Sequence, residues 1–246
     1  MKYLIANLKQ NKVLSEIQIY EADLRKKGVF NLNIIICPST PFLSVFQGNN
    51  YKLGTQDVSI YPQGAYTGET SAKQLASMGV KYAIIGHSER RKYFMENNSI
   101  LSQKIANSFA HGIQVVYCIG ETKEEYENKK TYSILEQQIA LVLNEFTREE
   151  LKNIIIAYEP VWAIGTGLTP NTQEIEETTK FIKKIILDYY ELDLAVLYGG
   201  SVDENNIIDF VKIASLDGFL VGGASLKTEK LFSMIDTFDK CWHTYT

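Results

Sequence analysis

The stretch IIIAYEPVWAIGTGLTPNTQEIEETTKFIKKIILDYYELDLAVLY, residues 154–198, contains the unit from which the fold of this chain can be inferred. It begins with an apolar run that ends in a glutamate (154–159), crosses a glycine-rich turn, continues as an amphipathic stretch (172–190) and ends in a second apolar run (194–198). Apolar runs without polar alternation are typical of strands buried on both faces, and the stretch between them has helical spacing. The unit is therefore predicted to be a strand, a helix and a parallel strand.

This unit repeats along the chain, because short apolar runs alternate with longer amphipathic stretches such as 133–146. The eight runs are YLIAN (3–7), LNIIIC (32–37), YKLGTQ (51–56), KYAIIG (81–86), IQVVYC (113–118), IIIAYE (154–159), LAVLY (194–198) and GFLVG (218–222). Asn171 ahead of Glu174 predicts a capped start for the helix at 172–190, and Gly28 predicts the end of the first helix.

Eight such units in a chain of 246 residues favour one α/β domain over residues 1–246, folded as a single (β/α)8 barrel. No charge block, low-complexity segment or proline-rich linker divides the chain. A doubly wound open sheet has similar local patterns and is the alternative, although the sequence lacks a GxGxxG or Walker loop after an early strand.

The charge balance of the chain argues against polyanionic partners. The sequence has 25 basic and 29 acidic residues, a formal net charge of -4, and no cluster of Lys and Arg suited to nucleic acid. Its 3 scattered cysteines do not form a disulfide framework, and no Cys/His pattern has the spacing of metal ligands. We therefore expect a reducing compartment and no metal site.

Hydropathy argues against a membrane location. No apolar run approaches the ~20 residues that span a bilayer, and the segment MKYLIANLKQ (1–10) lacks the apolar core of a signal peptide. We expect a soluble, cytoplasmic protein.

Polar residues gather where the predicted strands end. In a barrel, the carboxyl ends of the strands form the face on which active sites lie. The residues at these ends are Asn7 and Lys9 after the first strand, His87, Ser88 and Glu89 after the fourth, Glu159 after the sixth, Gly199, Gly200 and Ser201 after the seventh, and Gly222 and Gly223 after the eighth. Together they would provide a carboxylate base, an imidazole, a cation, an amide and glycine turns whose backbone N–H groups can bind an anion.

Each of these residues also has an ordinary structural explanation. Glu159 could be a solvated residue or an ion-pair partner, His87 could cap the adjoining helix with Ser88, and Lys9 could be a surface lysine. The glycine pairs could serve only tight turns or close packing. The presence of suitable residues at five strand ends nevertheless favours an active site.

Several long motifs resemble those of the triosephosphate isomerase family, and the resemblance covers essentially the whole chain. The motifs are AYEPVWAIGTG (157–167), IGHSERR (85–91), YGGSV (198–202), VGGASL (221–226) and QDVSIYPQGAYTGETSA (56–72). The resemblance implies a barrel enzyme of glycolysis and gluconeogenesis that needs no cofactor. Such an enzyme interconverts dihydroxyacetone phosphate and D-glyceraldehyde 3-phosphate by proton transfer through an enediolate.

The resemblance also implies residue roles. Glu159 would be the catalytic base, His87 the electrophile, and Lys9 a catalytic and substrate-binding residue beside Asn7. The phosphate-binding residues would be Gly165, Ser201, Gly222 and Gly223, and the supporting residues Ser88 and Glu89.

Two loops of the family are implied as well. Pro160 and Val161 would form the first hinge of a mobile lid whose tip is 163–167. The segment 61–70 would insert into a neighbouring subunit of a homodimer, where Thr67 would support the active site of that subunit.

The sequence departs from the family pattern at a few positions. Leu8 replaces a usual tryptophan, Gln10 replaces a frequent methionine, and Leu168-Thr169-Pro170 replaces Lys-Thr-Ala at the second hinge of the lid. Two other functions stay open: another isomerase or lyase on a phosphate-binding barrel, and a barrel that serves only as a binding or scaffold protein.

Overall fold

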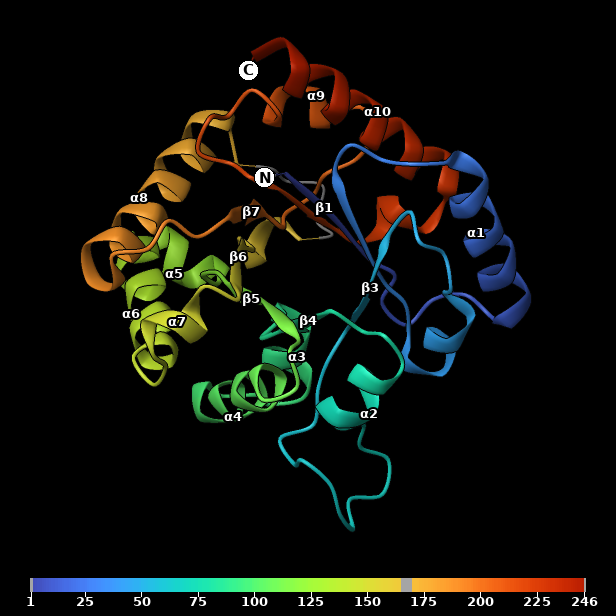
Figure 1. The fold of residues 1–246 in the computed structure, drawn as a ribbon. Coiled ribbons are helices and arrows are strands. Elements are labelled where there is room, and N and C mark those ends of the chain that lie inside the picture. The colour runs from blue at the N-terminus through green and yellow to red at the C-terminus, as the bar shows by residue number, and fades with distance from the viewer. Residues whose placement is uncertain (1, 165–169, 246) are drawn as a thin grey trace.

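The strands of the protein close into a parallel barrel in the order β1 to β8, with β8 paired to β1. This arrangement is seen in a computed structural model that describes residues 2–164 and 170–245 (Figure 1). The strands are β1 (Tyr3–Asn7), β2 (Asn33–Cys37), β3 (Lys52–Thr55), β4 (Tyr82–Ile85), β5 (Gln114–Ile119), β6 (Ile154–Tyr158), β7 (Val196–Tyr198) and β8 (Gly218–Val221). The predicted single (β/α)8 barrel is therefore confirmed, and the open sheet is excluded.

Helices surround the barrel on its outside (Figure 1). The α-helices are α1 (Leu14–Lys27), α2 (Ala72–Ser77), α3 (Ser88–Tyr93), α4 (Asn98–Phe109), α5 (Lys123–Glu127), α6 (Thr131–Leu143), α7 (Arg148–Leu151), α8 (Thr172–Tyr190), α9 (Ile207–Phe210) and α10 (Thr228–Tyr245). Three short 3₁₀ helices complete the list: η1 (Thr40–Val45), η2 (Val161–Ala163) and η3 (Gly223–Leu226).

The predicted ends of two helices are confirmed. Asn171 accepts a hydrogen bond from the backbone N–H of Glu174 and the Glu174 side chain accepts one in return, so α8 begins as expected. α1 ends at Lys27, and Gly28 follows with a φ of 89°, a conformation that glycine adopts at little cost. Several strands are one or two residues shorter than the predicted runs. The run 194–198, for example, is a strand only from Val196, where the Asp217 side chain accepts from the Val196 N–H at 3.1 Å.

Both faces of the strands are buried, which explains why the apolar runs lack polar alternation. Ile5, Val116 and Leu220 belong to a cluster inside the barrel. Leu4 and Val115, one position away on the same strands, belong to the larger cluster between the strands and the helices. Successive side chains of a strand point to opposite faces, so the two clusters divide each strand between them.

The long loop between β3 and α2 extends away from the barrel (Figure 1). Residues 61–69 of this loop are all exposed, including Thr67. The rings of Tyr61 and Tyr66 stack with centroids 3.5 Å apart, and the Asn107 side chain donates to the carbonyl of Ile60 at 2.7 Å. The loop is thus held at its base and at its tip while its surface faces solvent.

None of the helices in the described residues is sufficiently long and apolar to cross a membrane.

Candidate active site

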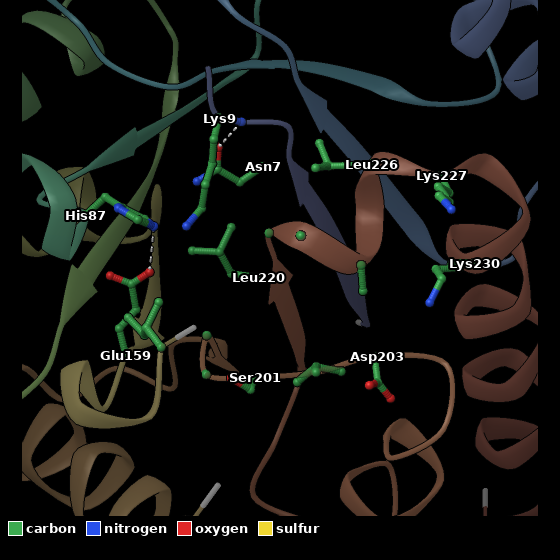
Figure 2. A pocket seen from close by; sticks show the side chains of 17 residues that line it. Asn7, Lys9, His87, Glu159, Ser201, Asp203, Leu220, Leu226, Lys227 and Lys230 are labelled. Carbon is green, nitrogen blue, oxygen red and sulfur yellow. Dashed lines mark hydrogen bonds and ion pairs between the residues drawn. The ribbon is translucent and has the colours of Figure 1, made fainter. Parts of the chain in front are cut away.

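A cavity of about 690 Å³ opens at the carboxyl ends of the strands (Figure 2). The sequence-predicted residues that line it are Asn7, Lys9, His87, Glu159, Gly199, Gly200, Ser201, Gly222 and Gly223. Gly165 lies outside the described residues, and Thr67 is on the exposed loop rather than in this cavity. Side chains from β1, β4 and β6 therefore meet in one place although they are far apart in the sequence.

The end of β1 directs Lys9 into the cavity through an unusual backbone conformation. Lys9 has a φ of 52°, which is uncommon for a residue with a side chain. Its N–H donates to the Asn7 side chain at 3.0 Å, and its carbonyl accepts from Ser39 Oγ and Gln56 Nε2, each at 2.8 Å. Leu8 is fully buried in the core between these two polar residues. The replacement at Leu8 thus leaves Asn7 and Lys9 in the cavity.

The Lys9 ammonium group is held between a carboxylate and a glycine. Its Nζ lies 2.5 Å from Glu89 Oε1. A Cβ at Gly222 would lie only 3.0 Å from Lys9 Cε, so the absence of a side chain there leaves room for the lysine.

His87 has both the structural role and the position that the sequence suggested. It caps α3, because its Nδ1 accepts a hydrogen bond from the Glu89 N–H at 3.2 Å. A ring nitrogen that accepts carries no proton, so this contact assigns the proton of a neutral imidazole to Nε2. His87 Nε2 faces Glu159 Oε1 at 3.1 Å (Figure 2). The helix cap therefore determines which nitrogen is presented to the cavity.

Glu159 is 2% exposed and has two polar contacts through its carboxylate. Oε1 faces His87, and Oε2 accepts from the backbone N–H of Ser88 at 3.0 Å. A Cβ at Gly199 would lie 2.8 Å from Glu159 Cγ, and one at Gly120 would lie 1.7 Å from the Glu159 carbonyl oxygen. These two glycines are needed because Glu159 packs directly against the neighbouring strand ends.

The glycine turns that follow β7 (199–202) and β8 (222–226) border the other side of the cavity. Ser201 Oγ donates to the Ala163 carbonyl at 2.7 Å, and its own carbonyl accepts from Asn206 Nδ2 at 3.0 Å. A Cβ at Gly223 would meet nothing within 4 Å, so the backbone there is open to a ligand. Backbone N–H groups in such turns can bind an anion without a charged side chain.

One residue next to the site was not identified from the sequence. Glu121 follows β5, is fully buried, and accepts from Trp162 Nε1 at 2.9 Å and from the Tyr158 hydroxyl at 3.2 Å. Its carbonyl also accepts from the Val161 N–H at 3.0 Å, so it holds η2 just after Glu159. Burial raises the pKa of the Glu121 carboxyl group. The only signal in the sequence is an acidic residue three positions beyond the predicted strand 113–118.

The arrangement is suited to moving a proton between a base and a carbon atom next to a polarised carbonyl group. Glu159 can accept a proton, His87 Nε2–H can donate a hydrogen bond, and Lys9 can stabilise developing negative charge. In the part of the chain that the structure describes, no three His, Cys, Asp or Glu side chains are grouped so that they could hold a metal ion.

Comparison with known proteins identifies the family. A family model described as triosephosphate isomerase matches residues 2–238. A protein named triosephosphate isomerase from Dictyoglomus turgidum is 37% identical, and the match covers 95% of this chain and 98% of that protein. Proteins of the same name from Clostridium novyi and Carboxydothermus hydrogenoformans are 39% and 40% identical, over 97% and 85% of this chain and 99% and 86% of those proteins. The chain therefore belongs to the triosephosphate isomerase family.

Proposed function

We propose that this protein interconverts dihydroxyacetone phosphate and D-glyceraldehyde 3-phosphate through an enediolate intermediate. The observation that carries the proposal is the facing pair of Glu159 and His87 at 3.1 Å, with Nδ1 of the imidazole engaged by a backbone N–H. This pair provides a base and a neutral hydrogen-bond donor on the same wall of a cavity. Membership of the family supports the same activity.

The reaction needs a proton to move between two adjacent carbon atoms. Glu159 removes the proton from C1 of dihydroxyacetone phosphate, and negative charge develops on the carbonyl oxygen at C2. His87 Nε2–H and the Lys9 ammonium group stabilise that oxygen as the charge arrives. The protonated Glu159 then returns the proton to C2, and a proton moves from the C1 hydroxyl to the C2 oxygen, so that the C1 aldehyde and the C2 hydroxyl form and no external oxidant or reductant is consumed.

Substrate binding has to free the base. Both oxygens of Glu159 are engaged in the present arrangement, one with His87 and one with the Ser88 N–H. A carboxylate oxygen that is engaged with another protein group is not free to accept a proton from the substrate. We therefore expect the substrate to displace at least one of these contacts before the proton is removed.

The phosphate group would bind to backbone N–H groups of Ser201, Gly222 and Gly223, and of Gly165 in the lid. Closure of the lid would exclude water from the enediolate, which would otherwise eliminate inorganic phosphate. Ala163, the first residue of the expected tip, is buried and its carbonyl accepts from Ser201 Oγ at 2.7 Å, which supports a moving part that begins after Ala163. Deletion of residues 164–167 should therefore slow isomerisation and raise phosphate release per turnover, which a phosphate-release assay would measure.

We also propose that the protein acts as a homodimer in the cytoplasm. The extended loop of residues 61–69 exposes Tyr61 and Tyr66, which are 38% and 42% accessible in the single chain. Exposed aromatic rings on a rigid loop are typical of surfaces that a partner covers. Thr67, at the tip of this loop, would then support the active site of the second subunit.

A coupled assay with purified protein tests the activity directly. We expect turnover of both triose phosphates in the absence of added metal or cofactor. An isomerase or lyase for another phosphate ester, or a binding protein without activity, would show no triose phosphate turnover, and that result would overturn the proposal.

A further inference from the structure

We infer that Lys227 is the cation that attracts the phosphate end of the incoming substrate, an inference that rests on the proposed function. Lys227 lies between η3 and α10 and lines the same cavity as Glu159. Figure 2 shows Lys227 across the cavity from Glu159, beyond the turn that follows β8. A phosphate bound to the glycines of this turn would therefore lie between the base and Lys227.

The lysines that line the cavity differ in their partners. Lys9 lies 2.5 Å from Glu89, and Lys230 lies 2.5 Å from Glu204. Among the described residues, Lys227 has no carboxylate partner, and its side chain is exposed. Among the described lysines that line this cavity, Lys227 is therefore the one whose charge is not paired with a carboxylate.

Carboxylates would otherwise dominate the charge around the cavity. Glu159 and Asp203 line it, in addition to the two carboxylates that pair with Lys9 and Lys230. Asp203 Oδ1 accepts from the backbone N–H groups of Asn205 and Asn206 as the cap of a turn. The chain as a whole also carries a formal net charge of -4. A phosphate dianion approaching this protein thus needs a local source of attraction.

Backbone N–H groups and an ammonium group act over different ranges. The N–H dipoles of the glycine turns act at hydrogen-bond distance, whereas a full charge acts over a Debye length, ~10 Å at 0.1 M salt. In water, the attraction between a charge of +1 and a dianion ~10 Å apart changes the rate of encounter, or the fraction of protein that holds the dianion, about fourfold. The loops therefore position the bound phosphate, and Lys227 supplies the longer-range attraction.

The experiment compares kcat/KM of the full-length protein and of Lys227→Gln at low and high ionic strength. At about 0.01 M salt we expect Lys227→Gln to lower kcat/KM about fourfold with kcat unchanged, and at about 1 M salt the two proteins should converge. Lys227→Glu reverses the charge, so it should have roughly the square of this effect, about sixteenfold. Lys227→Arg keeps the charge and should retain the parent value.

Two controls separate attraction at the cavity from other effects. Lys180→Gln makes the same change in net charge on the outer surface of α8, where Lys180 pairs with Glu176, and should leave kcat/KM unchanged. Titration of each protein with inorganic phosphate, followed by phosphorus NMR, tests Lys227 without relying on turnover. We expect the Lys227→Gln protein to bind phosphate about fourfold more weakly at low salt.

The inference fails if Lys227→Gln and the parent have equal kcat/KM and equal phosphate affinity at low salt. It also fails if the loss persists at high salt, because a structural effect of the substitution would not be screened. A parent protein that binds phosphate through Lys227 but has no isomerase activity would instead overturn the proposed function alone.

Discussion

The two ends of the barrel carry similar charged residues but pair them differently. At the amino end, Lys183 lies 2.8 Å from Asp217 and 3.5 Å from Asp193, and Lys2 lies 3.8 Å from Asp217. At the carboxyl end, charged side chains line a cavity of about 690 Å³: Lys9, Lys227, Lys230, Glu159 and Asp203. The charges of the amino end pair with one another beside a smaller cavity of about 250 Å³, whereas Glu159, His87 and Lys227 at the carboxyl end border the space that we propose the substrate occupies.

The backbone shows the same difference. Asp217 completes the sheet at the amino end: its N–H donates to the Val196 carbonyl at 2.8 Å, and its carbonyl accepts from the Tyr3 N–H at 2.9 Å. At the carboxyl end, Lys9 has a left-handed φ of 52° and depends on Asn7 to hold it. Strained residues persist at functional sites because the surrounding structure maintains them. The comparison teaches that the amino end serves stability and that the carboxyl end keeps groups available for chemistry.

The largest effect on kcat is expected from a change to the proposed base at the carboxyl end, Glu159. Glu159→Gln should lower kcat roughly 10³-fold or more while KM changes little, because an amide cannot accept the carbon-bound proton. Steady-state kinetics in the coupled assay measures both constants. A variant that keeps as much as a tenth of normal turnover would show that Glu159 is not the base.

Replacing a glycine by alanine should have different effects at the two ends of the barrel. Gly199→Ala places a Cβ 2.8 Å from Glu159 Cγ, so it should displace the base and lower kcat roughly 10- to 100-fold. Gly218→Ala at the amino end places a Cβ 1.9 Å from the Tyr3 carbonyl oxygen, at a φ of 152°, and should mainly lower stability. Kinetics and thermal melts of both variants test the contrast. Equal losses of kcat at equal stability would contradict it.

The exposed loop should link assembly to activity. Thr67→Asp places a charge on the surface that we propose a second subunit covers, and burying an unpaired charge is costly. We expect monomers by light scattering and a kcat that is lowered about tenfold or more, since the partner would no longer support the site. A fully active monomer would refute the role of Thr67.

Breaking the ion pairs of the amino end should affect stability alone. Asp217→Asn keeps an acceptor for the Val196 N–H but removes the charge that pairs with Lys183 and Lys2. These side chains are only partly exposed, so the free energy of unfolding should fall by about 1–2 kcal/mol with kcat unchanged. Denaturant unfolding and the coupled assay measure the two effects, and a fall in kcat at saturating substrate would contradict the division between the ends.

The smallest effect is expected for the buried carboxyl group beside the hinge, and it should depend on pH. Burial raises the folded-state pKa of Glu121 above its ordinary value of about 4.5, so the fold favours the protonated form. The stability that this form contributes is fully present below pH 4.5 and is lost as pH rises through the raised pKa. Glu121→Gln does not titrate, and its Tm relative to the parent should therefore increase by a few degrees between pH 4 and pH 8. A difference in Tm that is constant with pH would contradict this assignment.

The sequence by itself determined the barrel and the set of residues that meet in its cavity. Eight apolar runs without alternation indicate parallel strands, and the carboxyl ends of parallel strands converge on one face. Asn7, Lys9, His87 and Glu159 follow such runs directly, so their order in the chain was enough to predict that they meet. The motifs around them identified the family before any distance was known. The roles of these residues stay predictions for the kinetic tests above.

Only the tertiary structure decided how these groups are arranged. It assigned the proton of His87 to Nε2 through the cap of α3, and it showed that Gly199 leaves room for Glu159. It also placed Glu121 behind the hinge and left Lys227 without a carboxylate partner among the described residues. The physical reason is that a proton position, a packing gap or an unpaired charge depends on distances between residues far apart in the chain. Hydrophobic periodicity and local motifs do not contain those distances.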